Sequence, residues 1–356
     1  MADDLEANLR RTRRLMQLKT TKTFERVNAA LDQIRDSGPA QLSRVALRAS
    51  LLDTSEDSTP APATALLLPR GVALRFYLLA VFEAQCRLTA PSAWKSSRSL
   101  TGERGWSDLI AVDSGYDSAT DSYMTRQTKQ ARTAASSRLR QVQAALRTLE
   151  ALGKPLGDGE GDQGLVVVPR TPTTGRRQYA AFELMAESGR GSVLTNRRYT
   201  VPASGTEAVF TVPSEFFTRG WVQVLTPAET VTWLILQLMS QDYPGKHHES
   251  GVYLYANRRE GQFNMARDAF EDACRTLNGL GLIRYAEPPP SDEPGAAFWF
   301  SALLVAKPRY QAQRYQVVDE TLQKDALEQT IKELVIQRRA IVRRSKVRRA
   351  KGKSPS

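Results

Sequence analysis

The chain has 356 residues, of which 41% are hydrophobic and 25% are charged, and its formal net charge is +12. These proportions are ordinary for a soluble globular protein, and the length suits two domains. The sequence has no apolar run long enough to cross a membrane, no signal-peptide pattern and only two cysteines. We therefore expect a cytoplasmic protein with no membrane partner and no disulfide framework.

The first part of the chain is predicted to be helical. An apolar stripe from Phe24 to Ile34 follows helical spacing, and a second, shorter helical pattern covers residues 40–52. A Ser-, Thr- and Pro-rich stretch follows and is typical of a linker. We therefore expect a helical N-terminal extension over residues 1–52 and a linker over residues 53–65.

The next segment, residues 66–186, is predicted to be the first of two similar domains. In chain order it should contain a helix that is apolar on nearly every face (70–88), a short apolar piece (106–112), a long helix (124–152) and a strand hairpin (165–169 with 179–187). Such an order of elements predicts an α+β domain.

The second domain, residues 187–310, repeats this order. Strand-like runs come first, and a capping box at Thr226 with Pro227 at the first helical position then opens an apolar helix. The domain should continue with a short strand or helix (252–263), a helix capped by Asn264 and a hairpin (282–287 with 296–305).

One short sequence occurs at the same place in both domains. ALRTLEALG at residues 145–153 returns as ACRTLNGLG at residues 273–281, with six of nine letters identical. The glycine lets the chain reverse at positive φ. In each copy, the two leucines of the Leu-x-x-Leu-Gly corner that ends at this glycine should fill the core. Three helices joined to a hairpin through this corner resemble the winged-helix superfamily, over residues 66–186 and 207–306.

This resemblance implies an α+β, mostly α fold, with two winged-helix domains of three helices plus a β-hairpin. Helical N- and C-terminal extensions would flank them. Two winged helices on one chain are also similar in architecture to plasmid and phage replication initiators.

In a winged helix that binds DNA, the resemblance implies that the third helix enters the major groove. The first domain offers suitable donors, because residues 125–149 hold six basic residues and no acid. Arg and Gln can bind guanine and adenine bidentately, and the other cations can contact phosphate. The candidate residues are Arg126, Lys129, Arg132, Arg138, Arg140, Gln141 and Arg147. A solvated basic face is the alternative, although the lack of acids for i,i+4 pairing weakens it.

The corresponding helix of the second domain carries three carboxylates, which phosphate would repel. A packing or dimer module is therefore as well supported there as a DNA contact. Further candidates for phosphate contact lie beside this helix and at the predicted hairpin ends: Arg176, Arg177, Arg197, Arg198, Arg258, Arg259 and Arg267.

Residues 311–356 are predicted to form an amphipathic helix and a basic tail. The stretch 337–353 holds nine Lys or Arg and no acid, whereas the long middle of the chain is nearly neutral. The tail is expected to contact nucleic acid through Arg343, Arg344, Arg348 and Arg349. A solvated tail and a membrane-surface helix are the alternatives.

No enzyme signature is found in the sequence. His247 and His248 adjoin each other in a Pro/Gly loop, and no phosphate-binding glycine loop is present. We therefore expect no catalytic residues, no metal, no cofactor and no small-molecule substrate.

The expected function is sequence-specific binding of double-stranded DNA by a cytoplasmic, nucleoid-associated protein, with a homodimer as a possible form. Replication initiation or plasmid maintenance and transcriptional regulation fit equally well. The alternative is a structural or interaction protein whose winged helices dock protein partners and whose basic tail binds nucleic acid without sequence preference.

Overall fold

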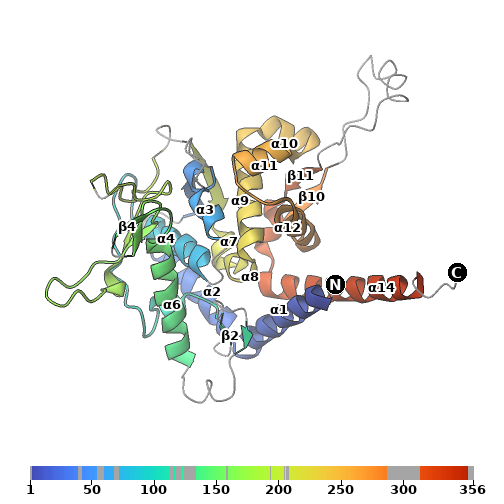
Figure 1. Cartoon of the computed structure of the whole chain (residues 1–356), viewed down its shortest axis with the longest axis horizontal. Helices are drawn as coiled ribbons and strands as arrows, with labels where there is room; N and C mark the ends of the chain where they lie inside the picture. The colour runs from blue at the N-terminus through green and yellow to red at the C-terminus, as the bar shows by residue number, and fades with distance from the viewer. Residues whose placement is uncertain are drawn as a thin grey trace.

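The computed structural model is an α+β fold that is mostly helical and contains small antiparallel sheets, as the sequence predicts (Figure 1). It describes residues 2–38, 42–53, 60–67, 72–112, 116–117, 122–123, 134–157, 159–192, 194–203, 205, 208–286 and 313–351. Within these ranges, no helix combines the length and apolar character that spanning a membrane requires.

The α-helices are α1 (Ala2–Thr20), α2 (Thr23–Asp36), α3 (Pro62–Ala65), α4 (Ala73–Arg87), α6 (Ala134–Glu150), α7 (Glu215–Thr218), α8 (Trp221–Val224), α9 (Pro227–Asp242), α10 (Pro244–Ser250), α11 (Ala256–Gly261), α12 (Arg267–Leu280) and α14 (Ala326–Lys351). Short 3-10 turns are η1 (Ala49–Leu51), η2 (Trp106–Asp108), η3 (Tyr179–Ala181) and η4 (Asp319–Gln323). The strands are β1 (Arg44–Arg48), β2 (Tyr116–Asp117), β3 (Ser122–Tyr123), β4 (Pro155–Gly157), β5 (Glu160–Gly161), β6 (Val166–Val167), β7 (Glu183–Leu184), β8 (Val209–Pro213), β9 (Val252–Tyr253), β10 (Ile283–Tyr285) and β11 (Arg314–Val317).

Two stretches of the chain share one order of elements. The first unit runs from α4 through η2 and α6 to the hairpin β6–β7, and the second unit runs from α9 through β9, α11 and α12 to the pair β10–β11. In both units the segment after the first helix pairs with the last strand. Lys95 bridges Glu183 of β7 in the first unit, and β9 pairs with β11 in the second.

The repeated corner sequences occupy equivalent places in the two units. Gly153 follows α6 with φ +85°, and Gly281 follows α12 with φ +77°. Both conformations lie in the left-handed region that favours glycine. The paired leucines are buried beside them: Leu149, Leu152, Leu277 and Leu280. The predicted role of the corner is therefore confirmed in both copies.

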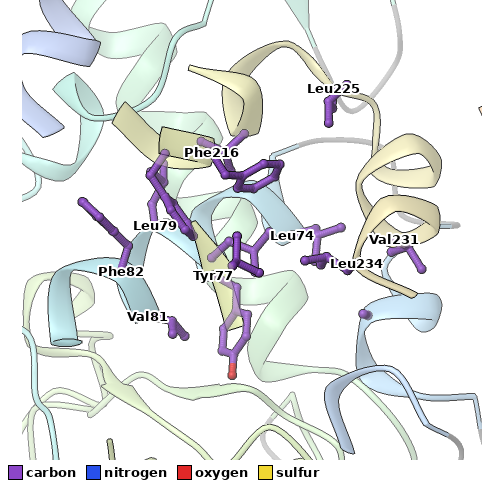
Figure 2. Close-up of a cluster of buried hydrophobic side chains, with 14 of the residues drawn as sticks. Leu74, Tyr77, Leu79, Val81, Phe82, Phe216, Leu225, Val231 and Leu234 are labelled. Atoms are coloured by element: carbon purple, nitrogen blue, oxygen red, sulfur yellow. The ribbon is translucent and has the colours of Figure 1, made fainter. Parts of the chain in front are cut away.

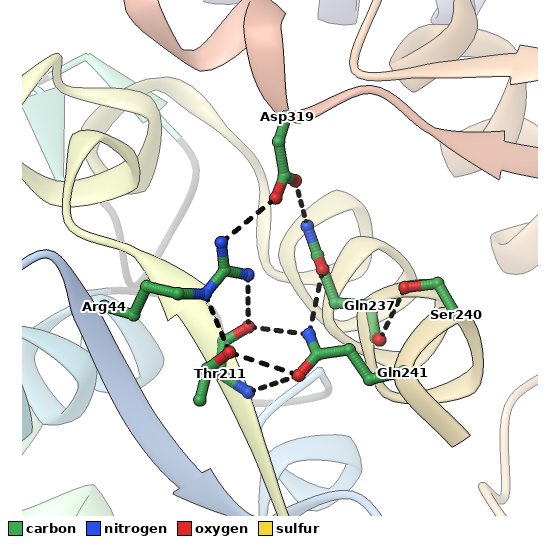
Figure 3. Close-up of polar contacts among 6 residues, drawn as sticks. All are labelled: Arg44, Thr211, Gln237, Ser240, Gln241 and Asp319. Carbon is green, nitrogen blue, oxygen red and sulfur yellow. Dashed lines mark hydrogen bonds and ion pairs between the residues drawn. The ribbon is translucent and has the colours of Figure 1, made fainter. Parts of the chain in front are cut away.

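The strands β1 and β8 join the two units. Each strand precedes its unit, and they pair antiparallel with Ala46 opposite Thr211. On its other edge, Ala46 donates to Gln85 Oε1 at 2.9 Å and accepts from Gln85 Nε2 at 2.6 Å. Thr211 makes the same two bonds with Gln241, both at 2.8 Å (Figure 3). Equivalent strands that contact each other reciprocally in this way are related by a local two-fold axis.

A polar network extends the contact around β8. Arg44 of β1 donates from Nε to the Thr211 hydroxyl at 2.8 Å and lies 3.4 Å from Asp319 of η4. Gln237 of α9 donates to the other carboxylate oxygen of Asp319 at 2.6 Å, as Figure 3 shows. The network therefore links both joining strands to α9 and to the chain that follows β11.

Helix α4 is buried on nearly all faces, as its apolar sequence predicts, because it lies between the two units. Its side chains Leu74, Tyr77 and Phe82 enter a core shared with Phe216 of α7 and Leu234 of α9 (Figure 2). The burial of so much aromatic and aliphatic surface on one helix stabilises the fold through the hydrophobic effect.

The N- and C-terminal helices lie side by side below α12 in Figure 1. Asn8 of α1 donates to the backbone oxygen of Leu334 in α14 at 3.1 Å, and both residues are buried. Arg11 anchors α1 to the second unit, because its guanidinium makes bonds of 2.6 and 2.7 Å to both carboxylate oxygens of Glu229 in α9. Glu229 is also the capping-box partner of Thr226, which confirms the predicted helix start.

Several local predictions are wrong. Residues 44–48 form strand β1 instead of a helix. Val45 and Leu47 are both buried and alternate with the more open Arg44, Ala46 and Arg48, and so short a run does not distinguish the two periods. Lys22, at φ 51°, divides the N-terminal helix into α1 and α2. Asn264 does not cap α12, whose N-cap is Ala266. The strand that pairs with β10 is β11, and the predicted partner, 296–305, lies outside the described residues.

Candidate nucleic-acid interface

Helix α6 turns one side to the core and the other to solvent. Leu146 and Leu149 are buried, so the helical period places Arg140, Gln143 and Arg147 on the opposite side. Arg140 and Arg147 are exposed, and Gln143 is half-buried. Neither arginine has a side-chain hydrogen bond or ion pair within the described part of the chain. This outer face of α6 is therefore positively charged and open to a ligand.

Two residues that the sequence assigns to the outer face lie elsewhere. Gln141 is 9% exposed, and Arg138 forms an ion pair of 3.5 Å with Asp108 of η2. Leu139 is only half-buried whereas Val142 is buried, so the apolar side of α6 is centred nearer Val142. Arg138 and Gln141 consequently belong to the packing of α6 within the first unit, and their role as DNA contacts remains a prediction.

The loop of the β6–β7 hairpin, residues 168–182, lies next to this face. Thr171 donates its backbone N–H to Arg176 at 2.9 Å, which closes a turn with an exposed Arg176 at its end. Arg177 has a structural role, since its guanidinium lies 3.0 Å from the buried carboxylate of Glu150. The same carboxylate accepts from the backbone of Val168 at 2.9 Å and so fixes the hairpin to the end of α6.

Gln143 of α6 and the hairpin loop line a concavity of about 570 Å³ beside the outer face of the helix. Gln143 contributes from the helix, and Arg170, Arg176 and Gln178 contribute from the loop. No carboxylate is among the described residues that line it. The concavity thus combines cations with amide groups that can donate and accept hydrogen bonds, a combination that suits phosphate and base edges.

The remaining candidates of the first unit are more scattered. Arg197 and Arg198 are exposed on the loop after β7, and Arg198 lies 3.4 Å from Glu183. Neither residue lines the concavity. Arg126, Lys129 and Arg132 lie outside the described residues.

The repeated corner allows the outer faces of α6 and α12 to be compared position by position. An offset of 128 residues aligns Arg140, Gln143, Ala144 and Arg147 with Asp268, Glu271, Asp272 and Arg275. The first face therefore carries two positive charges, whereas the second carries three negative charges and one positive charge. In α12, Arg275 lies 2.7 Å from Asp272, a partner that Arg147 of α6 lacks because Ala144 occupies that position.

The arginine candidates of the second unit are mostly engaged with the protein. Arg259 is 5% exposed and donates to the backbone oxygen of Met265 at 2.6 Å, so its guanidinium is engaged within the second unit. Arg267 is exposed but pairs with Glu271 at 2.7 Å. Arg258 is half-buried and lies over the ring of Tyr243.

The basic end of α14 is a second cationic surface. Arg343 and Arg344 are exposed on the helix. Arg348 and Arg349 also belong to α14, but their side chains lie outside the described part. In Figure 1 this end of α14 projects away from both units.

The sequence did not single out Gln143 or Arg170 as site residues. Gln143 could have been found from its spacing, since it lies three residues after Arg140 and four before Arg147, which places all three on one face of the helix. Arg170 comes to the site through the hairpin pairing with Arg177, and no local sequence signal indicates that contact.

Within the described residues, no group of three or more His, Cys, Asp or Glu side chains is placed to hold a metal ion. Compared with protein-family models, curated proteins and solved structures, the chain matches none of them.

Proposed function

We propose that the chain is a sequence-specific, double-stranded DNA-binding protein with two winged-helix units. Both units consist of a first helix, a segment that pairs with the last strand, a short helical element (η2 or α11), a longer helix (α6 or α12) and a final strand pair. This order fits the three helices and hairpin of a winged helix. Since no catalytic constellation was found in the sequence, we propose binding without catalysis.

The observation that carries the proposal is the acid-free, open outer face of α6 beside a basic hairpin loop. An α-helix fits the major groove of B-DNA, and exposed Arg and Gln side chains on it can read base edges. Arg140, Gln143 and Arg147 would enter the groove. Arg170 and Arg176 would contact the flanking backbone.

The outer face of α12 is proposed to have a packing role. Asp268, Glu271 and Asp272 would meet phosphate with like charge, which costs free energy at short range. The C-terminal half of α12 also packs against α14, where Glu333 approaches Gly279. The second unit then serves to position α14 and the first unit, and other parts of its surface remain open to partners.

Replication initiation, plasmid maintenance and transcriptional regulation all need a protein of this kind, so we propose them as the biological settings, with a cytoplasmic, nucleoid-associated location. A homodimer is compatible with the proposal but is not required, because the chain already holds two units that are joined through the pairing of β1 and β8.

A second candidate function rests on the projecting end of α14. If Arg343 and Arg344 supply most of the affinity, the chain is an interaction protein that holds nucleic acid without sequence preference. The acidic outer face of α12 would then be a docking surface for a basic protein partner.

The test is binding-site selection on random duplexes, followed by titrations with the selected duplex and a scrambled one. Arg140→Ala combined with Arg147→Ala should abolish discrimination between the two duplexes, since each lost base contact costs about 1–3 kcal/mol. Arg267→Ala combined with Arg275→Ala is the matched control at the other helix and should retain discrimination. Equal discrimination by all three proteins would overturn the proposal.

A further inference from the structure

A cluster of tyrosines and cations lies on the second unit, away from α6. It comprises Tyr243 at the end of α9, Tyr253 of β9, Tyr255 before α11, Lys246 of α10, Arg258 of α11 and Arg314 of β11. Tyr243 is 40% exposed and Tyr255 is 52% exposed. In Figure 1, α10 and α11 lie together at the upper end of α9, whereas α6 lies at the lower left.

The cations are arranged over two of the three rings. Lys246 Nζ and the Arg258 guanidinium lie 5.4 and 5.7 Å from the centre of the Tyr243 ring. The Arg314 guanidinium lies 5.1 Å from the centre of the Tyr253 ring. Such cation–π contacts hold the positive groups next to aromatic surface.

Tyr255 is arranged differently. Its ring meets Tyr253 edge-on, with centres 4.7 Å apart and an interplanar angle of 70°. No cation lies over the Tyr255 ring within the described residues. An exposed ring that is held by its neighbour through an edge contact offers a flat apolar face for stacking.

These residues border a hollow of about 200 Å³. Tyr243, Lys246, Tyr253, Tyr255 and Arg258 line it together with aliphatic groups, and no carboxylate is among its described lining residues. The hollow is separate from the outer face of α12. Arg258 lines this hollow, but the next residue, Arg259, lines the one beside α12.

We propose that this cluster binds an unpaired base of single-stranded nucleic acid, with the base stacked on Tyr255 and the adjacent phosphates contacted by Lys246 and Arg258. Aromatic side chains beside cations are the common means of holding single strands without sequence preference. An isolated exposed tyrosine needs no function, but three tyrosines and two cations line one hollow without a carboxylate among its described lining residues, and they match both parts of a single strand, its bases and its phosphates.

This inference does not depend on duplex binding by α6, because the two surfaces share no residue. The full chain would be titrated with labelled oligo-dT and oligo-U of about 20 nucleotides, a length that spans the site sizes of single-strand binding proteins. Tyr255→Ala should weaken binding roughly 5- to 150-fold, the range of one lost stacking contact. Tyr255→Phe should bind like the wild type, since it keeps the ring.

Tyr285→Ala is the matched control, because Tyr285 is a tyrosine of similar exposure, 46%, that does not line this hollow. It should bind single strands like the wild type. Lys246→Gln tests the phosphate contact separately and should reduce the slope of log affinity against log salt by about 0.7. A preference for the DNA or the RNA probe would support the site and identify the sugar that it accepts.

The proposal is overturned if Tyr255→Ala binds both probes as the wild type does, or if Tyr285→Ala weakens binding equally. The double variant Arg140→Ala, Arg147→Ala separates the two proposals. If it loses duplex discrimination but keeps oligo-dT binding, both surfaces act independently. If the wild type lacks duplex discrimination but binds oligo-dT through Tyr255, only the α6 proposal fails.

Discussion

Gln85 and Gln241 make the same pair of hydrogen bonds from equivalent helices, but only Gln85 is buried. Each side-chain amide completes the open edge of a joining strand, Gln85 at Ala46 and Gln241 at Thr211. Gln85 is 3% exposed and also donates to the Tyr199 hydroxyl at 2.9 Å, whereas Gln241 is exposed. Water can therefore take over the hydrogen bonds of the exposed Gln241 amide but not those of the buried Gln85 amide.

This difference predicts unequal costs for the same substitution. Gln85→Ala leaves the partly buried N–H and C=O of Ala46 without the buried amide that pairs with them and should lower the free energy of unfolding by about 1–3 kcal/mol. Gln241→Ala should cost roughly 0.5 kcal/mol, because the freed groups of Thr211 reach solvent. Urea unfolding of the two variants measures both values. Equal losses of unfolding free energy in the two variants would show that the two amides are in equivalent environments.

The ion pair between Arg11 and Glu229 is the strongest predicted anchor of α1. Both side chains are largely buried, with 14% and 6% exposed, and the contact is bidentate. Arg11→Ala leaves the Glu229 carboxylate buried without its charge partner and should destabilise the protein by about 3–5 kcal/mol. Arg10→Ala is the adjacent control. Its pair with Glu6 is solvent-exposed and should be worth less than about 1 kcal/mol.

His247 predicts a pH dependence of stability. Its Nε2 accepts a hydrogen bond from the backbone of Val317 at 2.9 Å, which requires the neutral ring. Burial, followed by the neighbouring His248, lowers the pKa of His247 below its usual 6.5, although Asp319 opposes this shift and Arg284 adds to it. Because the unfolded chain takes up this proton more readily, the contribution is complete above about pH 6.5 and is lost as the pH falls through the folded pKa.

The measurement is urea unfolding between about pH 7.5 and pH 5, in the window set by these pKa values. His247→Ala should be less stable than the wild type at the upper end, and the difference should shrink as the pH falls. His248→Ala should reduce the pH dependence only in part, because it removes the neighbour that helps to lower the pKa of His247 but leaves burial, the larger cause. A constant difference between His247→Ala and the wild type would contradict the assigned protonation state.

The basic end of α14 should act on nucleic acid without regard to sequence. Arg343→Ala combined with Arg344→Ala should weaken binding to selected and scrambled duplexes by the same factor. The slope of log affinity against log salt should fall by up to about 1.8, or about 0.9 for each lost phosphate contact. A loss confined to the selected duplex would place base recognition in α14 instead of α6.

The parts of the fold that the sequence predicts are those with strong local signals. Thr226 and Glu229 form the expected capping box, and Gly153 and Gly281 end their helices as the repeated corner indicates. The joining strand β1 was not predicted, because its five residues find their partner in β8, about 165 positions later in the chain. Pairing over such a distance leaves no periodicity that separates a short strand from a short helix.

The sequence predicted the candidate site only in part, because contacts between distant segments leave no local sequence signal. The absence of acids marked α6, and Arg140 and Arg147 lie on its open face. The sequence does not distinguish these two residues from three other arginines that bind acceptors within the protein. Arg138 binds Asp108, Arg177 binds Glu150 and Arg259 binds the Met265 carbonyl. Only tertiary contacts decide which cations remain open.

The most direct test of the central claim is to give α6 the outer face of α12. Arg140→Asp, Gln143→Glu and Ala144→Asp reproduce Asp268, Glu271 and Asp272 at surface positions, where substitutions usually change stability by less than about 0.5 kcal/mol each. The reciprocal change in α12 is the control. Titration with the selected duplex should show that the altered α6 no longer binds it in preference to a scrambled duplex, while the altered α12 retains this preference. Undiminished preference by the altered α6 would contradict the account.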